Sequence, residues 1–273
     1  MQNSEVLFYK KNGYFLYKGF FDPAKAEEIR KESQMIFIHQ MINNGIINRH
    51  DISEDEFEIG IVKLFNDNFE IYANCGKQCQ HLINLHRLSL DKKLIQKLTE
   101  FGLQKPVVST RPVLYFNKAK LAKSEEFYKV PPHQDWRSMQ GSINSMVVWL
   151  PLCNIPENLG ALTVIPGSHK FGLLDSTENA WFRQIAKQDL SDFISVEVEP
   201  GDALFFSSFL VHSSGNNVLD KIRWSCHFRY NDLEEEAFIE RGYPHPYIYK
   251  PVQELLTPDF PVLNRVQKLF NEE

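Results

Sequence analysis

The chain has 273 residues, of which 43% are hydrophobic and 24% charged, and its formal net charge at pH 7 is -5. This length and composition are typical of one globular domain, and no linker rich in Pro, Gly or Ser divides the chain. Because it has neither a basic stripe nor an acidic tail, nucleic acid and anionic membranes are poor candidates as partners.

The N-terminal residues carry no apolar core of a signal peptide, and no run in the chain approaches the roughly 20 apolar residues of a membrane span. The four cysteines, Cys75, Cys79, Cys153 and Cys226, form no C-x-x-C pair and suggest no disulfide framework. Cys75 and Cys79 alone are a weak zinc motif. We therefore expect a cytoplasmic protein with reduced thiols.

The first hundred residues are predicted to be mostly helical, after a short apolar stretch at 13–21. Asp22-Pro23 supplies an N-cap and a proline at the first helical position, and Asn43-Asn44-Gly45 ends that helix. The sequence Ser-Glu-Asp-Glu at 53–56 is a capping box that opens a second helix. Two more helical regions are predicted at 82–88 and 91–102, the latter capped by Asp91.

From about residue 107 the pattern changes from helices to strands. Six runs are rich in β-branched and aromatic residues, and turn sequences such as Asn158-Leu159-Gly160 separate them. Strands of this kind predict a β-sandwich or barrel against which the helices pack. We predict one domain, with helical support at 1–106, a β core at 107–232 and a tail or lid at 233–273. The six runs are 110–117, 143–153, 161–168, 194–200, 202–214 and 222–230.

A histidine and an aspartate stand two residues apart in VPPHQDW, residues 130–136. In an extended chain, residues i and i+2 point to the same face, so His133 and Asp135 can hold one metal ion together. His133-Gln134-Asp135 is the only His-x-Asp/Glu triplet in the chain. Because roughly one is expected by chance at this composition, the motif gains its weight from residues further along.

His212 lies in LVHSSGNN, where an apolar strand gives way to a polar turn, and it is the candidate third ligand. Two imidazoles and one carboxylate leave three positions open on an octahedral ion, which is the arrangement of non-haem Fe(II) oxygenases. Ser214 follows His212 by two residues, and Arg223 follows it by eleven. A buried guanidinium beside a hydroxyl is suited to bind a carboxylate.

The order of these motifs resembles the phytanoyl-CoA dioxygenase family of Fe(II)/2-oxoglutarate oxygenases. The resemblance covers roughly residues 111–230, with a weaker echo in NGYFLYKGFFDPAKAEEIR at 12–30. It implies a double-stranded β-helix, a jelly-roll of two sheets, in agreement with the predicted strands. The motifs that carry it are His133-x-Asp135, Trp149, NLGALTVIPGSHK at 158–170, GDALFFSSFLVHSSGNN at 201–217, and Arg223.

The resemblance also implies a role for each matched residue. Fe(II) would be bound by His133, Asp135 and His212. Arg223 and Ser214 would hold the distal carboxylate of 2-oxoglutarate, whose keto-acid end would chelate the iron. The implied reaction couples decarboxylation of 2-oxoglutarate to succinate and CO2 with hydroxylation of an unactivated C–H bond by O2.

Further residues are assigned to the walls of the site. Trp149 would line the cosubstrate pocket, and Tyr115 or Asn117, with Lys118 beside them, would offer 2-oxoglutarate a polar contact. Halogenating relatives have Gly or Ala in place of the metal-binding Asp, so Asp135 favours oxygenation.

Candidate contacts to a small-molecule substrate are Trp136 and Arg137, just after the metal motif, and His227, on the strand face of Arg223. His169 in PGSHK is interpreted as a turn residue. No basic cluster suited to the phosphates of CoA lies near the motifs, so a CoA ester is possible but not preferred. The sequence indicates neither the substrate nor the oligomeric state.

Two alternatives stay open at this stage. One is a cupin-like isomerase or hydrolase that uses Zn2+ as a Lewis acid, and the other is a catalytically silent ligand-binding module on the same scaffold. Arg223 and Ser214 speak against the first, because such an enzyme needs no clamp for a dicarboxylate. The intact set of ligands speaks against the second.

Overall fold

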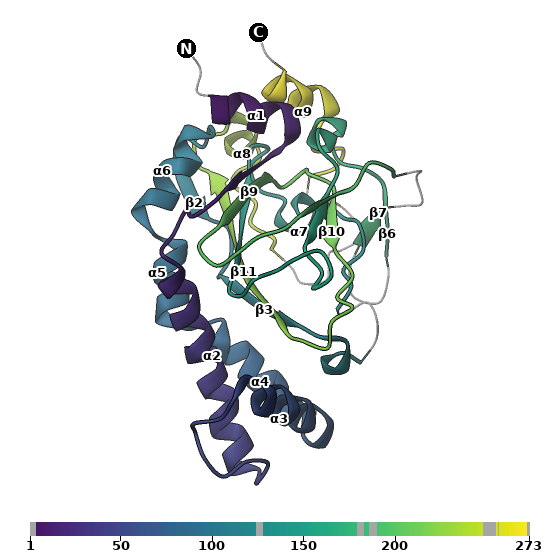
Figure 1. Cartoon of the computed structure of the whole chain (residues 1–273). Coiled ribbons are helices and arrows are strands. Elements are labelled where there is room, and N and C mark those ends of the chain that lie inside the picture. Colours follow the sequence, from purple (N-terminus) through teal and green to yellow (C-terminus); the bar gives the residue numbers. More distant parts are fainter. Residues whose placement is uncertain are drawn as a thin grey trace.

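The computed structural model describes residues 4–123, 128–178, 183–185, 190–247, 255 and 257–271. Its centre is formed by antiparallel strands in two sheets, beside a separate two-stranded ribbon (Figure 1). The larger sheet contains β1 (Tyr14–Tyr17), β2 (Pro106–Val108), β3 (Val113–Asn117), β4 (Met146–Pro151), β9 (Ala203–Ser207) and β11 (Arg223–Asp232). The smaller sheet contains β5 (Leu162–Val164), β8 (Ile194–Val196) and β10 (His212–Ser214), and the ribbon contains β6 (Ser176–Glu178) and β7 (Arg183–Ile185).

The strand order of the larger sheet is β1-β9-β4-β11-β2, with β3 paired to the same edge of β11 as β2. The smaller sheet has the order β10-β5-β8. Apolar side chains of both sheets share one buried cluster that includes Trp149, Val164 and Phe206. The predicted architecture of two packed antiparallel sheets is therefore confirmed.

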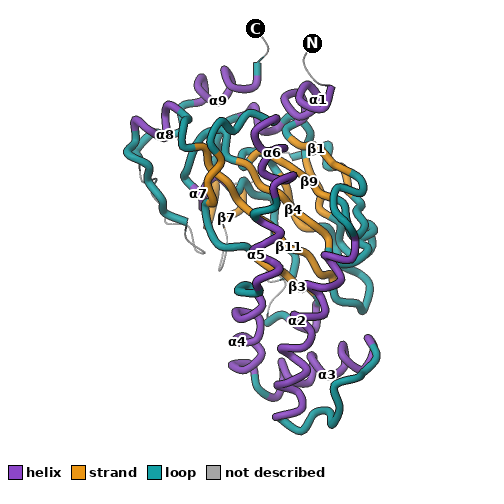
Figure 2. The backbone as a smooth tube through the Cα atoms, turned by 90° about the vertical axis from the view of Figure 1, so that its left-hand side faces the viewer, coloured by secondary structure: helices purple, strands orange, loops and turns teal. Residues whose placement is uncertain are grey.

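Helices surround this core on its outer side. They are α1 (Ser4–Asn12), α2 (Pro23–Asn43), α3 (Glu54–Asp67), α4 (Phe69–Cys79), α5 (Ile83–Ser89), α6 (Lys92–Glu100), α7 (Trp136–Met139), α8 (Glu236–Glu240) and α9 (Leu263–Phe270), with 3-10 turns η1 (Ala119–Leu121) and η3 (Ser168–Phe171). Figure 2 shows α5 and α6 running across the larger sheet, while α2, α3 and α4 extend beyond its end. In the described part of the chain, no helix has the length and apolar character needed to cross a membrane.

The predicted helix starts are confirmed by their caps. Asp22 accepts a hydrogen bond from the backbone of Ala24, Asp91 accepts one from Lys93, and Ser53 and Glu56 form the reciprocal capping box. Within residues 4–105, three elements were not predicted, namely α1, α4 and β1. The strand β1 pairs with β9, so part of the N-terminal region belongs to the larger sheet itself.

Helix α4 explains two of the cysteines. The thiols of Cys75 and Cys79 lie against backbone carbonyls of α2, at 4.0 Å from that of Ile36 and 3.9 Å from that of Ser33. Both side chains are buried in the core that joins the helices to the larger sheet. Both thiols therefore belong to the packing between α4 and α2.

The apolar run at 202–214, predicted as one strand, is two strands in different sheets. Strand β9 ends at Ser207, and β10 begins at His212 in the opposite sheet. Between them, Ser208 donates its backbone N–H to the carbonyl of Ser145, and Val211 donates to the hydroxyl of Ser168. Ser207 and Ser208 interrupt the apolar run where β9 ends, but two serines alone do not predict a turn, so the crossover was not predicted. The crossover brings His212 to the sheet that faces β11.

Candidate active site

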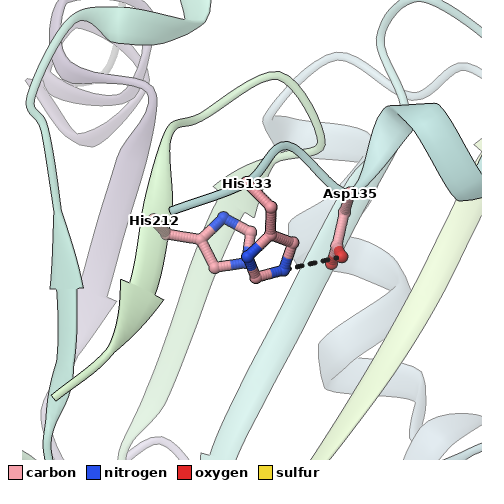
Figure 3. Close-up of side chains that lie close together, drawn as sticks. All are labelled: His133, Asp135 and His212. Atoms are coloured by element: carbon pink, nitrogen blue, oxygen red, sulfur yellow. Dashed lines mark ion pairs between the residues drawn. The ribbon is translucent and has the colours of Figure 1, made fainter. Parts of the chain in front are cut away.

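Three predicted ligands, His133, Asp135 and His212, meet between the two sheets (Figure 3). One donor atom from each lies within 4.8 Å of the others, and no second such group of metal-ligating side chains occurs in the described ranges. The backbones of His133 and His212 form an antiparallel bridge, with N–H to carbonyl distances of 2.9 and 3.1 Å. The main chain therefore fixes the spacing of the two imidazoles.

Each imidazole is also held in one tautomer. Nδ1 of His133 lies 2.8 Å from the carbonyl of Pro131, and Nδ1 of His212 lies 2.9 Å from that of Leu210. A carbonyl oxygen can only accept, so each Nδ1 carries the proton and each Nε2 keeps a lone pair for a metal ion. Burial, reinforced by His133, lowers the pKa of His212 to about 3, which keeps its ring neutral at pH 7.

Asp135 reaches the two histidines differently from the expectation. Its backbone is helical, with φ -64° and ψ -27°, and it caps α7 instead of continuing an extended segment. The prediction that an extended chain aligns His133 and Asp135 is thus wrong, and the turn into α7 brings them together. Asp135 Oδ1 lies 3.6 Å from Nε2 of His133 and 3.1 Å from Nη2 of Arg229.

The charge of this buried carboxylate is maintained by its neighbours. Burial opposes ionisation of Asp135, but the Arg229 guanidinium, and after it His133 and His212, hold the pKa of Asp135 well below its ordinary value. An ionised carboxylate beside two neutral imidazoles is a donor set that suits Fe(II). The residues present therefore fit the metal that the family resemblance implies.

Arg223 is the first residue of strand β11, which also carries Arg229. Its side chain is almost completely buried. Its guanidinium donates to the carbonyl of Gly160 and, at 3.4 Å, to the hydroxyl of Ser214. Its Nε–H has no hydrogen-bond partner among the described residues. Burial lowers the pKa of Arg223, yet an arginine stays charged in proteins. A buried cation contacted by neutral acceptors is a site for an anion such as the carboxylate of 2-oxoglutarate.

Two glycines allow the loops around Arg223 to approach closely. Gly160 has φ +83°, and a Cβ atom there would lie 2.8 Å from the carbonyl oxygen of Gly215. A Cβ atom at Gly215 would lie 2.3 Å from the carbonyl oxygen of Ala161. The glycines of NLG and SSGNN are therefore required for the contact that places the Gly160 carbonyl on Arg223.

A cavity of roughly 270 Å³ joins the triad to Arg223. Of the residues predicted at the site, Tyr115, Trp149, Ser214, Arg137 and His227 line it together with the triad and Arg223. Val147, Leu162 and Phe206 add apolar wall. The cavity thus combines an apolar wall with a few charged groups, which is the usual character of a small-molecule site.

Two predicted contacts are corrected. The indole of Trp136 is fully buried, stacks on Phe209 and donates to the carbonyl of Ser142, so it supports α7 and does not line the cavity. The amide of Asn117 donates to the carbonyl of Tyr128 and likewise lies outside the cavity lining. Asn117 shares a strand face with Tyr115, but its amide is bound to the Tyr128 carbonyl, so the part of this strand that lines the cavity is Val113, Leu114 and Tyr115.

Two more residues near the motifs have structural roles. Lys118 forms a buried ion pair with Glu58 of α3 at 2.7 Å, which ties the helices to the sheet. His169 lies in η3, with Nε2 3.1 Å from the carbonyl of Lys10 and its ring against Phe270, so its interpretation as a turn residue is confirmed.

Three contributors to the site were not identified from the sequence. Arg229 binds the ligand Asp135, and Tyr247 reaches the cavity from the C-terminal tail. Gln134, between the two metal ligands, bonds to the backbone of Gly172, Leu174 and Phe209 and so anchors the loop. Arg229 could have been found by its even spacing from Arg223, whereas the contact of Tyr247 is purely tertiary.

Comparison with known proteins agrees with this geometry. A family model described as phytanoyl-CoA dioxygenase matches residues 9–225. A probable phytanoyl-CoA dioxygenase of Caenorhabditis elegans is 26% identical over 246 residues, covering 83% of this chain and 74% of that protein. The peroxisomal phytanoyl-CoA dioxygenase of Homo sapiens is 24% identical over 245 residues, covering 81% and 66%.

The fold has solved counterparts. The epimerase SnoN, in complex with Fe3+, alpha ketoglutarate and nogalamycin RO, has a TM-score of 0.57 at 16% identity, covering 84% of this chain and 82% of that one. With the family model spanning most of the sequence, the chain belongs to the phytanoyl-CoA dioxygenase family and is a non-haem, 2-oxoglutarate-dependent oxygenase.

Proposed function

We propose that this enzyme hydroxylates a small organic molecule, using Fe(II), 2-oxoglutarate and O2. The proposal is carried by one observation, namely that the triad His133, Asp135 and His212 shares a cavity with the buried cation Arg223. The triad would hold the iron, and Arg223 with Ser214 would hold the distal carboxylate of the cosubstrate. When bound, iron and 2-oxoglutarate supply the oxidising chemistry.

The protein contributes binding, orientation and exclusion of water. Arg223 would fix one end of 2-oxoglutarate, with Tyr115 and Trp149 along its side. The bridge between His133 and His212 keeps the metal ligands in place. The apolar wall of the cavity limits the access of water, which favours reaction with a bound C–H bond over unproductive turnover. Asp135 occupies the position that a halide would need, which favours hydroxylation over halogenation.

The alternatives can be weighed against the same residues. A metal-dependent isomerase or hydrolase on this fold would have no use for a buried guanidinium facing the metal site. A silent binding module would not require two imidazoles held in the tautomer that offers both Nε2 lone pairs to one point. Both features support the oxygenase proposal.

The test begins with binding and proceeds to turnover. Protein loaded with Fe(II) in the absence of oxygen should bind 2-oxoglutarate in calorimetry. With O2 and ascorbate, a panel of metabolites should contain compounds that raise succinate formation above the background. The exposed-surface variant Arg265→Gln serves as control. Equal succinate formation in wild-type protein and in His133→Ala would contradict the proposal.

The expected partners and location remain predictions. The composition argues against nucleic acid and membranes as partners, and a cytoplasmic location is expected from the sequence alone. The human relative is named as peroxisomal. Fractionation of cells expressing the tagged full chain would decide the location.

A further inference from the structure

The two residues proposed to hold the distal carboxylate of 2-oxoglutarate are the ends of one loop. Strand β10 ends at Ser214 and β11 begins at Arg223, and the loop 215–222 connects them. At its first residue, the N–H of Gly215 donates to the carbonyl of Ala161 at 3.0 Å. The position of Arg223 opposite Ser214 therefore depends on what holds the other end of this loop.

A carboxylate of helix α3 holds that end. The ladder between β3 and β11 pairs Asn117 with Arg223, so Lys118 and Ile222 would be the next pair of the register. Both bind Glu58 instead. Its Oε1 accepts the backbone N–H of Ile222 at 3.0 Å, and its Oε2 accepts a hydrogen bond from the Lys118 ammonium at 2.7 Å. Glu58 thus joins the two strands beside Arg223.

Successive residues of α3 contact the neighbours of Arg223 on both sides. Glu58 binds Ile222, which precedes Arg223, and the ring of Phe57 packs near that of Trp224, which follows it, with ring centres 6.1 Å apart. The backbone of Arg223 cannot shift along α3 without breaking one of these contacts. The helix therefore sets where the guanidinium enters the cavity.

The ion pair of Glu58 and Lys118 is buried, with side chains 12% and 6% exposed. Lys118 also donates to the carbonyl of Asp220 in the loop, at 3.0 Å. Because both charges lose their hydration, such a pair adds little stability compared with apolar residues, but its geometry is defined. A second pair, Asp55 with Lys221, joins the same helix to the same loop and is 80% and 54% exposed. Exposed pairs contribute little, so this one is a matched control.

We propose that Glu58 is a positioning residue, which holds Arg223 where its guanidinium meets the distal carboxylate of 2-oxoglutarate. The inference rests on the proposed function, because it assumes that Arg223 binds that carboxylate. Glu58 is not among the described residues that line the cavity, so it acts through the backbone of β11 and not by touching the cosubstrate. Its loss should weaken binding of the distal carboxylate and spare the end of 2-oxoglutarate that faces the metal site.

The experiment compares 2-oxoglutarate with 2-oxopentanoate, which has the same carbon chain and a methyl group in place of the distal carboxylate. Both are titrated by calorimetry into protein loaded with Fe(II), without oxygen. The measured preference is the Kd of 2-oxopentanoate divided by that of 2-oxoglutarate. A general loss of structure would weaken both ligands and leave this ratio unchanged.

Three variants test the role of the carboxylate. In Glu58→Ala the preference should fall by roughly tenfold, the equivalent of one hydrogen bond to a charged group. Glu58→Gln keeps an acceptor for the N–H of Ile222 and should lose only about threefold. Asp55→Asn should keep the preference of the wild-type protein, because it removes only the exposed pair.

Wild-type binding separates the two proposals. If wild-type protein binds no 2-oxoglutarate, the proposed function itself is wrong. If it binds both acids equally, or if Glu58→Ala keeps the full preference for 2-oxoglutarate, the positioning role is wrong. An equal fall in Asp55→Asn would also overturn it, because the buried pair would then have no special part. If Glu58→Ala does not fold, an unchanged preference in Glu58→Gln overturns the role.

Discussion

The two faces of strand β11 carry opposite chemistry. The outward side chains Trp224, Cys226, Phe228 and Tyr230 are buried in the apolar core shared with the helices. The inward ones, Arg223, Ser225, His227 and Arg229, are polar and line the cavity. In a simple sandwich the space between the sheets is the hydrophobic core. Here the helices provide a second core outside the larger sheet, and the space between the sheets contains both an apolar cluster and the cavity.

This division separates stability from function along a single strand. Trp224 packs on Phe57 of α3, with ring centres 6.1 Å apart, and Phe228 is 2% exposed. Burial of such rings offsets the cost of holding guanidiniums inside the molecule. Substitutions on the inner face should therefore affect binding and turnover, and those on the outer face should affect folding.

The largest effect is expected at the triad. Replacement of His133, Asp135 or His212 by Ala removes one of three metal ligands, and 2-oxoglutarate turnover should fall on the order of 10³-fold or more. Iron content and succinate formation measure the loss, and circular dichroism should show a retained fold. A variant with normal iron content and normal turnover would show that the cavity is not the metal site.

Adjacent residues on the two faces give the sharpest contrast. Phe228→Ala should lower the free energy of unfolding by about 3–5 kcal/mol, because it opens a hole in the outer core. His227→Ala, one residue away on the cavity side, should cost far less. Urea unfolding of both variants measures the difference. Similar losses for the two would contradict the division of the faces.

Arg223 should control affinity for the cosubstrate with little effect on iron. Arg223→Gln removes the buried cation, and the Kd for 2-oxoglutarate should rise by about 30-fold or more, corresponding to roughly 2 kcal/mol. Calorimetry on iron-loaded protein measures this change, and Arg223→Lys should recover part of the affinity. An unchanged Kd in Arg223→Gln would show that Arg223 does not bind 2-oxoglutarate.

The smallest effect is a dependence of stability on pH that arises away from the cavity. Burial lowers the pKa of His169 from 6.5 to about 4, so the unfolded chain binds a proton more readily than the folded one. The contribution of the neutral His169 side chain to the free energy of unfolding is therefore fully present above pH 6.5 and is lost as the pH falls towards 4. About 2 kcal/mol of this free energy is lost by pH 5.

The measurement for this prediction is urea unfolding at pH 7 and pH 5. His169→Leu should lose about 2 kcal/mol less than wild-type protein between these two conditions. His245→Leu, at a position without such burial, should behave as wild type. Equal losses in His169→Leu and wild type would disprove the assignment.

Local patterns were sufficient for much of the fold. The starts of α2, α3 and α6 could be predicted because each depends on a cap within three residues. The separation of β4, β5 and β8 follows from turn residues between apolar runs. The metal ligands could be identified because their motifs occur in a particular order along the chain.

The remaining features depend on contacts between distant segments. No neighbouring residue shows that Asp135 adopts a helical backbone or that the run ending at His212 crosses between sheets. Trp136 was misassigned because proximity to the motif does not reveal which way its side chain points. The pairing of Arg229 with Asp135 joins positions 94 residues apart and emerges only when β11 is placed beside α7.

The main-chain bridge between His133 and His212 has a consequence for how the ion is acquired. Since the hydrogen bonds of the bridge are independent of the imidazole nitrogens that face the ion, the two rings are preorganised before loading. Iron uptake then requires little loss of conformational freedom at these positions. The protected amides of His133 and His212 should exchange slowly with deuterium in apoprotein and holoprotein alike, so the scaffold can give up and regain its iron without refolding.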